Sequence, residues 1–323
     1  MGMILPLIYL GVGFGLATLL PEHWGNRLKE SASALLTRWI IPTVIVYIIA
    51  TSRPELFFMA ASTMVLMALL VRCAAFFTND PVQRLALVYL NAGIFGIPVV
   101  ASFWGEEAVR LYVGAYIGNS VMGNILGTSL MRRETNTDGL TTSRAKPTRK
   151  AVTRKAAVGA VLRSLLTNRP IIAVATGLIC LPVGPFLNTH AAGIYRLITW
   201  VFSFVGLMVL GMWLSTARLH RTDLKQAARW ALLRVVLVSI YSVGILTAAH
   251  WMHTHTGVHL DQLLAHPQVL FILGVLPPAA NIVILETHYR HEGTAAPIIA
   301  SGAVVSLGMI ALAVPILQLV FSN

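Results

Sequence analysis

Two short stretches place amide side chains, glycines and prolines inside otherwise apolar runs of this chain. The first reads NAGIFGIP from Asn91 to Pro98, and the second reads LPPAAN from Leu276 to Asn281. Proline removes a backbone donor and clashes with the preceding turn, and glycine weakens a helix, so we expect a helix break in each stretch. At membrane depth, freed backbone groups persist only against protein or a water-filled cavity. Each break is therefore a predicted binding site.

The chemistry expected at two such breaks is the binding of an anion. A half-helix that starts at a break presents free N–H groups and the positive end of its dipole, and both favour a carboxylate. Asn91 and Asn281 flank the breaks, and an amide side chain can bind a ligand as well as freed backbone groups. The alternative is that each asparagine only caps a broken helix.

Polar residues in neighbouring runs can join the same site. The run after the first break carries Asn119, Ser120 and Asn124 between glycine pairs of the kind that allow close helix packing. Ser301, in the last run, is a further candidate, with packing as its alternative role. The predicted substrate-binding residues are Asn91, Gly93, Gly96, Ile97, Pro98, Asn119, Asn124, Pro277, Pro278, Asn281 and Ser301.

The composition is that of an all-α membrane protein with several spans. Hydrophobic residues make up 56% of the 323 residues and charged residues 11%, which excludes an ordinary soluble domain. The net charge of +12 does not indicate nucleic-acid binding, because the basic residues cluster between apolar runs and form no stripe. Cys73 and Cys180 both lie inside apolar runs, so the sequence predicts neither a disulfide framework nor a cysteine metal site.

The apolar runs predict ten membrane-spanning helices of about 20 residues each. A polar segment, 132–169, separates the fifth run from the sixth, and we interpret it as a disordered linker that ends in a short interfacial helix at Lys155–Leu166. The predicted spans are Met3–Leu20, Ser33–Ala50, Leu56–Phe77, Val82–Phe103, Ala108–Met131, Pro170–Leu187, Gly193–Ala217, Ala228–His250, Val269–Thr287 and Ala295–Val320.

The distribution of lysine and arginine predicts the orientation. If the linker is cytoplasmic, nineteen of these residues lie on its side of the membrane and three on the other side. Cytoplasmic loops are enriched in lysine and arginine, so both termini are expected outside. The predicted location is the plasma (inner) membrane of the cell.

Five runs before the linker and five after it predict two repeats of inverted topology. The first run reads Pro6-x-Ile8-x-x-x-x-Gly13, and the sixth reads Pro170-x-Ile172-x-x-x-x-Gly177. The two interrupted runs are the fourth and the ninth, which are equivalent in this scheme. Inverted repeats would bring both breaks together near the middle of the bilayer, where helices 4 and 9 can cross.

The predicted middle of each span lacks charged residues, so a proton relay is not obvious. Glu286 lies at the end of the ninth span and Arg234 about two turns into the eighth. We interpret them as an interfacial ion pair and a snorkelling arginine, with a coupling role as the alternative. Sodium coupling through backbone carbonyls stays open. Between the eighth and ninth spans, a histidine cluster permits either a metal site or a solvated loop: His250, His253, His255, His259 and His266.

The fourth run resembles the signature of the auxin efflux carrier family, through Asn91, Gly93, Gly96 and Pro98 followed by Gly105. The similarity extends over nearly the whole chain, although the linker is shorter and more basic than the loops of many plant members. The other matching features are Pro42 in the second run, GLMVLGM from Gly206 to Met212 in the seventh, and Leu276–Asn281 in the ninth.

The resemblance implies the fold shared with bile-acid and sodium/proton antiporter-like transporters. It implies scaffold helices 1–2 at residues 1–51 and 6–7 at 170–217, core helices 3–5 at 52–131 and 8–10 at 218–323, and a cytoplasmic linker at 132–169. It also implies an elevator-like motion of the core, a homodimer through the scaffold, and organic-anion substrates such as auxin-like or dicarboxylic acids. The residues that it assigns to the crossover are Asn91, Gly96, Pro98 and Pro277.

The function that these observations predict is secondary transport of a small organic anion, with no cofactor beyond a coupling Na⁺ or H⁺. The alternatives are a sodium-coupled symporter of the same fold, and a channel or ligand sensor built on it. An enzyme is not expected, because the sequence contains no HExxH, GxSxG or paired carboxylates inside a span.

Overall fold

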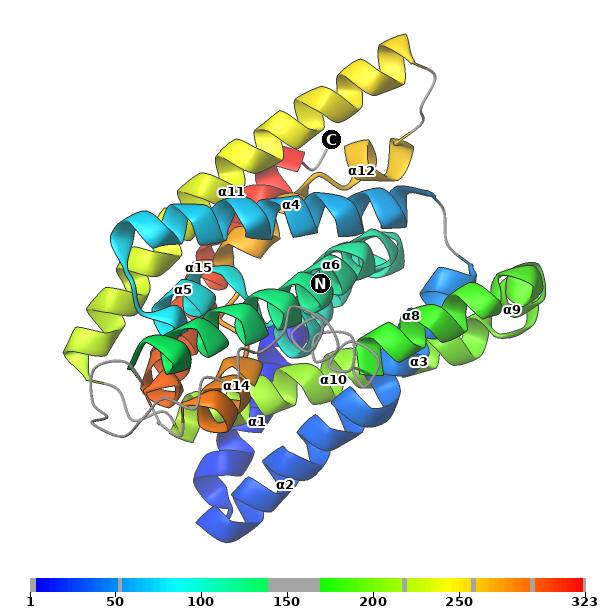
Figure 1. The fold of residues 1–323 in the computed structure, drawn as a ribbon. Coiled ribbons are helices and arrows are strands. Elements are labelled where there is room, and N and C mark those ends of the chain that lie inside the picture. Colours follow the sequence, from blue (N-terminus) through cyan, green and yellow to red (C-terminus); the bar gives the residue numbers. More distant parts are fainter. Residues whose placement is uncertain are drawn as a thin grey trace.

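The computed structural model describes residues 4–51, 54–138, 169–216, 220–256, 260–290 and 294–321. Within these ranges the chain is helical (Figure 1). Its one extended pairing there is an isolated antiparallel bridge between Leu90 and Pro278. The predicted interfacial helix Lys155–Leu166 and His259 lie outside the described residues. The predicted all-helical class is confirmed for the described part of the chain.

The helices follow the predicted spans closely at most positions. They are α1 (Ile4–Leu19), α2 (Glu22–Leu35), η1 (Leu36–Ile40), α3 (Ile41–Ala50), α4 (Pro54–Phe77), α5 (Pro81–Val88), η2 (Ala92–Gly96), α6 (Ile97–Asp138), α8 (Arg169–Ile179), η3 (Leu181–Val183), α9 (Gly184–His190), α10 (Ala192–Thr216), α11 (Arg221–His255), α12 (Asp261–Ala265), α13 (Gln268–Phe271), η4 (Ile272–Val275), α14 (Asn281–Tyr289) and α15 (Ala295–Phe321).

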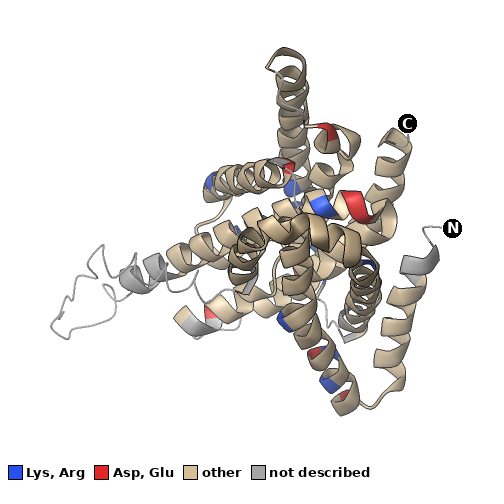
Figure 2. Cartoon of the chain, turned by 90° about the vertical axis from the view of Figure 1, so that its right-hand side faces the viewer, with Lys and Arg blue, Asp and Glu red and all other residues tan. Residues whose placement is uncertain are grey.

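Five described helical segments are long and apolar enough to cross a membrane. A sixth candidate is the pair Ile171–Ile179 and Leu181–His190, which is bent by 58°. Most of the length of the helices carries no charge (Figure 2). These apolar helices are those of a membrane-embedded protein. The five segments are Glu22–Ala50, Glu55–Phe77, Ala192–Val209, Arg221–His255 and Ala295–Phe321.

Two helices begin earlier than predicted. The second span starts at Glu22 instead of Ser33, and the eighth starts at Arg221 instead of Ala228. In both cases the added turns are polar and carry an acidic residue near the N-terminus, Glu22 or Asp223, which the helix dipole stabilises. Hydropathy alone therefore placed these helix starts too late.

Four pairs of helices pack along one another. α1 lies along α10 and α3 along α8, while α4 lies along α6 and α11 along α15. We call the end of the molecule where α6 ends and α8 begins the linker face, and the end where α3 leads into α4 the opposite face. α6 itself turns back at Gly105, whose φ of 78° is a conformation that favours glycine. That turn separates the predicted fourth and fifth spans.

Candidate functional site

The two predicted breaks meet in the centre of the molecule and bond to each other. The amide of Asn91 donates to the carbonyl of Pro277 at 2.8 Å, and the amide of Ala279 donates to the carbonyl of Tyr89 at 2.8 Å. Four backbone groups that a regular helix would satisfy internally are thus paired across the two breaks. We call residues 89–91 and 277–279 together the crossover.

The first break lies several residues earlier than the proline suggested. The chain is non-helical at 89–91, whereas Pro98 sits in the first turn of α6. Pro98 therefore lies inside the helical segment that begins at Ala92, directly after the π-helical turn η2, and does not itself start a helix. Such irregular helix geometry often accompanies proline, which cannot donate to the preceding turn. Pro98 instead packs on α10, because a Cβ on Gly206 would lie 2.5 Å from its ring.

Asn119 of α6 holds the first break in its extended form. Its Oδ1 accepts from the amide of Leu90 at 3.1 Å, and its Nδ2 donates to the carbonyl of the same residue at 2.8 Å. The side chain is 1% exposed. Both of its polar groups therefore serve the backbone of the break, in the way that a neighbouring strand would.

Arg234 of α11 binds the ends of both helices that lead into the crossover. Its Nε donates to the carbonyl of Gly274 in η4 at 2.9 Å, and its Nη1 donates to the carbonyl of Ala86 in α5 at 3.4 Å. The last carbonyls of a helix carry partial negative charge, so the cation is placed at two negative helix ends. The predicted snorkelling was wrong, because Arg234 is only 2% exposed.

A cavity of about 470 Å³ extends from the crossover toward the linker face. None of its lining residues is charged. Five predicted substrate-binding residues line it, together with residues from the second span and from α14. The lining residues are Thr37, Ile41, Tyr89, Leu90, Asn91, Ala92, Gly93, Ile94, Tyr116, Asn119, Ser120, Asn124, Ala279, Ala280, Asn281 and Ile284.

The remaining predicted residues are buried in packing behind this cavity. Gly96 contacts Tyr112, whose hydroxyl donates to the carbonyl of Ala92 at 3.1 Å. Pro278 packs against Gly302, next to Ser301 in α15. The predicted residues that do not line the cavity are Gly96, Ile97, Pro98, Pro277, Pro278 and Ser301.

Tyr89 is a cavity residue that the sequence analysis missed. Its hydroxyl accepts from Nδ2 of Asn281 at 3.0 Å and from Nδ2 of Asn124 at 3.5 Å. The ring lies against Gly123, where a Cβ would collide with it. A tyrosine in an apolar run carries no distinguishing signal, and its partner Asn281 lies 192 residues away in the chain.

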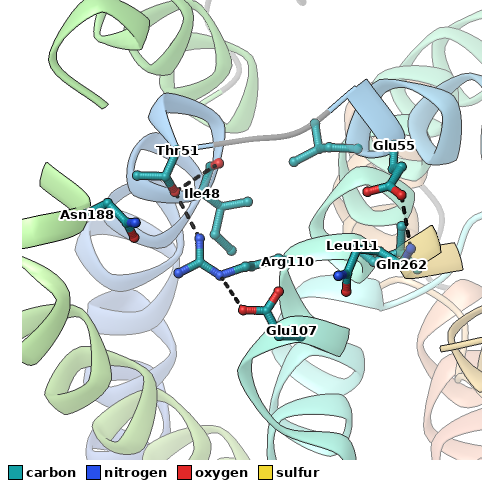
Figure 3. Close-up of a pocket in the computed structure, with 9 residues that line it drawn as sticks. Ile48, Thr51, Glu55, Glu107, Arg110, Leu111, Asn188 and Gln262 are labelled. Carbon is teal, nitrogen blue, oxygen red and sulfur yellow. Dashed lines mark hydrogen bonds and ion pairs between the residues drawn. The ribbon is translucent and has the colours of Figure 1, made fainter. Parts of the chain in front are cut away.

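A second, smaller cavity of about 200 Å³ lies at the opposite face, between the ends of several helices (Figure 3). Arg110 reaches across it from α6. Its Nη1 donates to Thr51 Oγ1 at 3.0 Å, and its Nε lies 3.5 Å from the carboxylate of Glu107. The guanidinium also lies 5.6 Å from the ring centre of Tyr47 and 5.5 Å from that of Tyr195. This arginine therefore joins α6 to both α3 and α10.

At the linker face, two acidic side chains accept hydrogen bonds from the first amides of helices, and one of them also pairs with an arginine. Asp80 caps α5 through the amide of Val82 at 3.0 Å and pairs with Arg290 at 3.3 Å. Glu286, expected in an ion pair, instead accepts from the backbone amides of Thr294 and Ala295 at 3.0 and 2.9 Å. Its carboxylate thus caps the N-terminus of α15.

The histidines do not form a metal site in the described part of the chain. His250, His253 and His255 lie on the last turns of α11, not in a loop. His253 pairs with Asp261 at 3.5 Å, and the described residues contain no group of three ligands. Burial lowers the pKa of His266, an effect that nearby Glu107 opposes. A structural role at the helix end fits these contacts.

No protein-family model matches the chain, and no curated protein does. The crossover and the cavity beside it are therefore the features from which a function can be inferred. The resemblance to auxin efflux carriers depends on the motif residues alone.

Proposed function

We propose that the protein is a secondary transporter that carries a small organic anion, in particular a carboxylate, and binds it in the cavity beside the crossover. The observation that carries this proposal is the pairing of two broken helices at an uncharged, amide-lined cavity. Interrupted helices that meet inside a membrane are a typical feature of secondary transporters. Irregular backbone at that depth requires such a cavity or surrounding protein.

The polarity of the crossover favours an anionic substrate. The helix that begins after Asn91 and the helix α14, which begins at Asn281, both start at the cavity wall. Helix N-termini attract negative charge. The negative ends of the two preceding helices are turned toward Arg234. The cavity is therefore left with the positive ends, while asparagine side chains supply further donors.

Ten spans in two inverted repeats are part of the proposal, and the packing supports them. Under this scheme the contact of α1 with α10 is equivalent to the contact of α8 with α3, and the contact of α4 with α6 to that of α11 with α15. Gly13 and Gly177, matched in the two repeats, both lie where a Cβ would collide with the partner helix. Both repeats thus use a small residue at the equivalent close approach.

An elevator-like motion of core against scaffold is the mechanism we propose. The cavity is bounded by Thr37 and Ile41 of the scaffold on one side and by the crossover of the core on the other. Contacts of Arg110 with Thr51 and two tyrosines join core and scaffold at the opposite face. With the linker cytoplasmic, this arrangement corresponds to a state that faces the cytoplasm.

Uptake into proteoliposomes tests the proposal. The full chain is reconstituted and assayed with a panel of radiolabelled mono- and dicarboxylates, with and without gradients of Na⁺ and H⁺. We expect saturable uptake of at least one carboxylate, reduced at least tenfold by Asn91→Ala or Asn281→Ala, because each removes an amide from the cavity wall. Asn79→Ala is the matched control, since Asn79 is exposed away from the cavity.

Three results would contradict the proposal: uptake that both cavity variants leave unchanged, conductance without saturation, and binding without uptake. The last two would favour a channel and a sensor respectively. Dependence of saturable uptake on the sodium gradient would identify a symporter of the same fold.

A further inference from the structure

Tyr89 lines the cavity, and its hydroxyl oxygen is already used as an acceptor by two other lining residues. It receives one N–H from Asn281 of α14 and one from Asn124 of α6. A phenolic oxygen has two acceptor positions and one hydrogen to donate. Since both acceptor positions are filled by amide N–H groups, that hydrogen is the remaining polar function of the group.

The position of the hydroxyl is fixed from several sides. Tyr89 is 3% exposed, its carbonyl is bonded to the amide of Ala279, and its ring rests on Gly123. The described contacts of the hydroxyl include no acceptor for its hydrogen. A buried hydroxyl hydrogen without an acceptor costs free energy. An acceptor atom that enters the cavity would remove that cost.

We propose that Tyr89 is a specificity-determining residue, and that its hydroxyl donates a hydrogen bond to the carboxylate of the bound substrate. This inference rests on the proposed function and names the chemistry of selection at that site. Ligands whose polar group is an acceptor, above all a charged one, satisfy the hydroxyl. Ligands that can only donate, such as ammonium compounds, leave the hydroxyl hydrogen without an acceptor, and the oxygen cannot accept from them because the asparagine N–H groups occupy its acceptor positions.

The expected selectivity follows from the charge on the acceptor. A hydrogen bond to a charged partner contributes more than one to a neutral partner. Loss of the hydroxyl should therefore weaken binding of an acid more than binding of the corresponding primary amide, which has the same shape without the charge. The ratio of the two dissociation constants isolates this contribution from any change in cavity shape.

The test measures that ratio in the full chain purified in detergent. The carboxylate that gives the largest thermal shift in a panel headed by benzoate is titrated against its primary amide, benzamide for benzoate. We expect Tyr89→Phe to reduce the preference for the acid about tenfold, the factor that corresponds to the loss of one charged hydrogen bond. Tyr47→Phe, at the opposite face and outside the cavity lining, serves as the control and should keep the preference.

Replacement of Tyr89 by 3-fluorotyrosine keeps the hydroxyl and makes it a stronger donor, so it should increase the preference for the acid. This variant tests the hydrogen bond from the Tyr89 hydroxyl if Tyr89→Phe does not fold. An unchanged acid-to-amide ratio in the folded variants would overturn the inference while leaving the transporter proposal intact. Absence of carboxylate binding by the unmodified chain would instead overturn the proposed function.

Discussion

At the scale of single residues, the crossover depends on side chains that replace missing helix bonds. Asn119 pairs with both backbone groups of Leu90, and Arg234 binds carbonyls in the two helices that end there. Buried backbone groups of native proteins are almost always paired, so such side chains are required wherever a helix is interrupted away from water. A polar residue inside an apolar run can thus serve the backbone instead of a ligand.

Arg234→Met tests this role of the arginine. The change leaves the carbonyls of Gly274 and Ala86 without their hydrogen-bond donor. It also removes the positive charge that Arg234 places at the negative ends of the two helices. We expect the free energy of unfolding to fall by about 2 kcal/mol or more, because an unsatisfied buried group costs about 1–3 kcal/mol. Thermal unfolding in detergent measures the change. Arg229→Met, on the exposed side of the same helix, should have little effect.

Equal melting temperatures of Arg234→Met and the unmodified chain would contradict this role, since relief of the buried charge would then outweigh both lost bonds. Arg234→Lys separates the contributions of charge and geometry. Lysine keeps the charge but lacks the planar fork that reaches two carbonyls, so we expect an intermediate melting temperature.

The sequence predicted the chemical character of the site better than the role of each residue. It identified Asn91, Asn124 and Asn281 as cavity amides, and the structure brings them together. It did not show that Asn119, unlike these three residues, uses its amide to bond to the backbone of Leu90, and it missed Tyr89. Such assignments depend on which groups lie side by side after folding, and a linear pattern does not contain that information.

At the scale of helices, the positions of most helices and of the second break, at Leu276–Asn281, were predictable from the sequence, whereas the first break was placed too late. Long apolar runs fixed α1, α4, α10 and α15 to within a few residues. The break before η2 was placed too late because Pro98 lies within the helical segment that follows the break, directly after the π-helical turn η2. The 58° bend between α8 and α9 was also missed, because a bent span has the same hydropathy as a straight one.

Gly96→Ala tests how tightly the helix after the first break is packed. A Cβ at this position would collide with the hydroxyl of Tyr112, which bonds to the carbonyl of Ala92. We expect a loss of stability of about 1–3 kcal/mol from overpacking, measured as a lower melting temperature in detergent. Gly244→Ala in α11 is the control, because a Cβ there meets nothing within 4 Å. That variant should be neutral or slightly stabilised. Equal melting temperatures of Gly96→Ala and Gly244→Ala would show that Gly96 is not tightly packed against Tyr112.

At the scale of the whole molecule, the contacts of Arg110 connect two groups of helices. It is carried by α6, while Thr51 and Tyr47 belong to the second span and Tyr195 to α10. These contacts close the opposite face while the larger cavity extends from the crossover toward the linker face. If core and scaffold move against each other, this cluster must separate in every cycle.

Arg110→Ala should shift the population toward a state that is open at the opposite face. The measurement is the rate of labelling of Ile48→Cys, which lines the smaller cavity and is 1% exposed, by a membrane-impermeant thiol reagent in a background with Cys73 and Cys180 replaced. We expect labelling to accelerate severalfold, because a cation–π contact and a hydrogen bond are lost together.

Arg196→Ala is the matched control for Arg110→Ala. The pair of Arg196 with Glu106 spans 4.0 Å, and the Arg196 side chain is 71% exposed, so its loss should change little. Faster labelling in both variants would indicate general loosening of this face. Unchanged labelling in Arg110→Ala would mean that the cluster does not hold the two groups of helices together.

The backbone bonds of the crossover also set an order of assembly. Tyr89 and Asn91 are translated long before Pro277 and Ala279. The carbonyl of Tyr89 and the amide of Asn91 therefore lack these partners until the second break has been synthesised. Asn119 is translated before the second break and can bond to the backbone of Leu90. It does not bond to the carbonyl of Tyr89 or to the amide of Asn91. The crossover can therefore form only after the second break has been translated, and a product truncated before Leu276 would leave the carbonyl of Tyr89 and the amide of Asn91 without these partners.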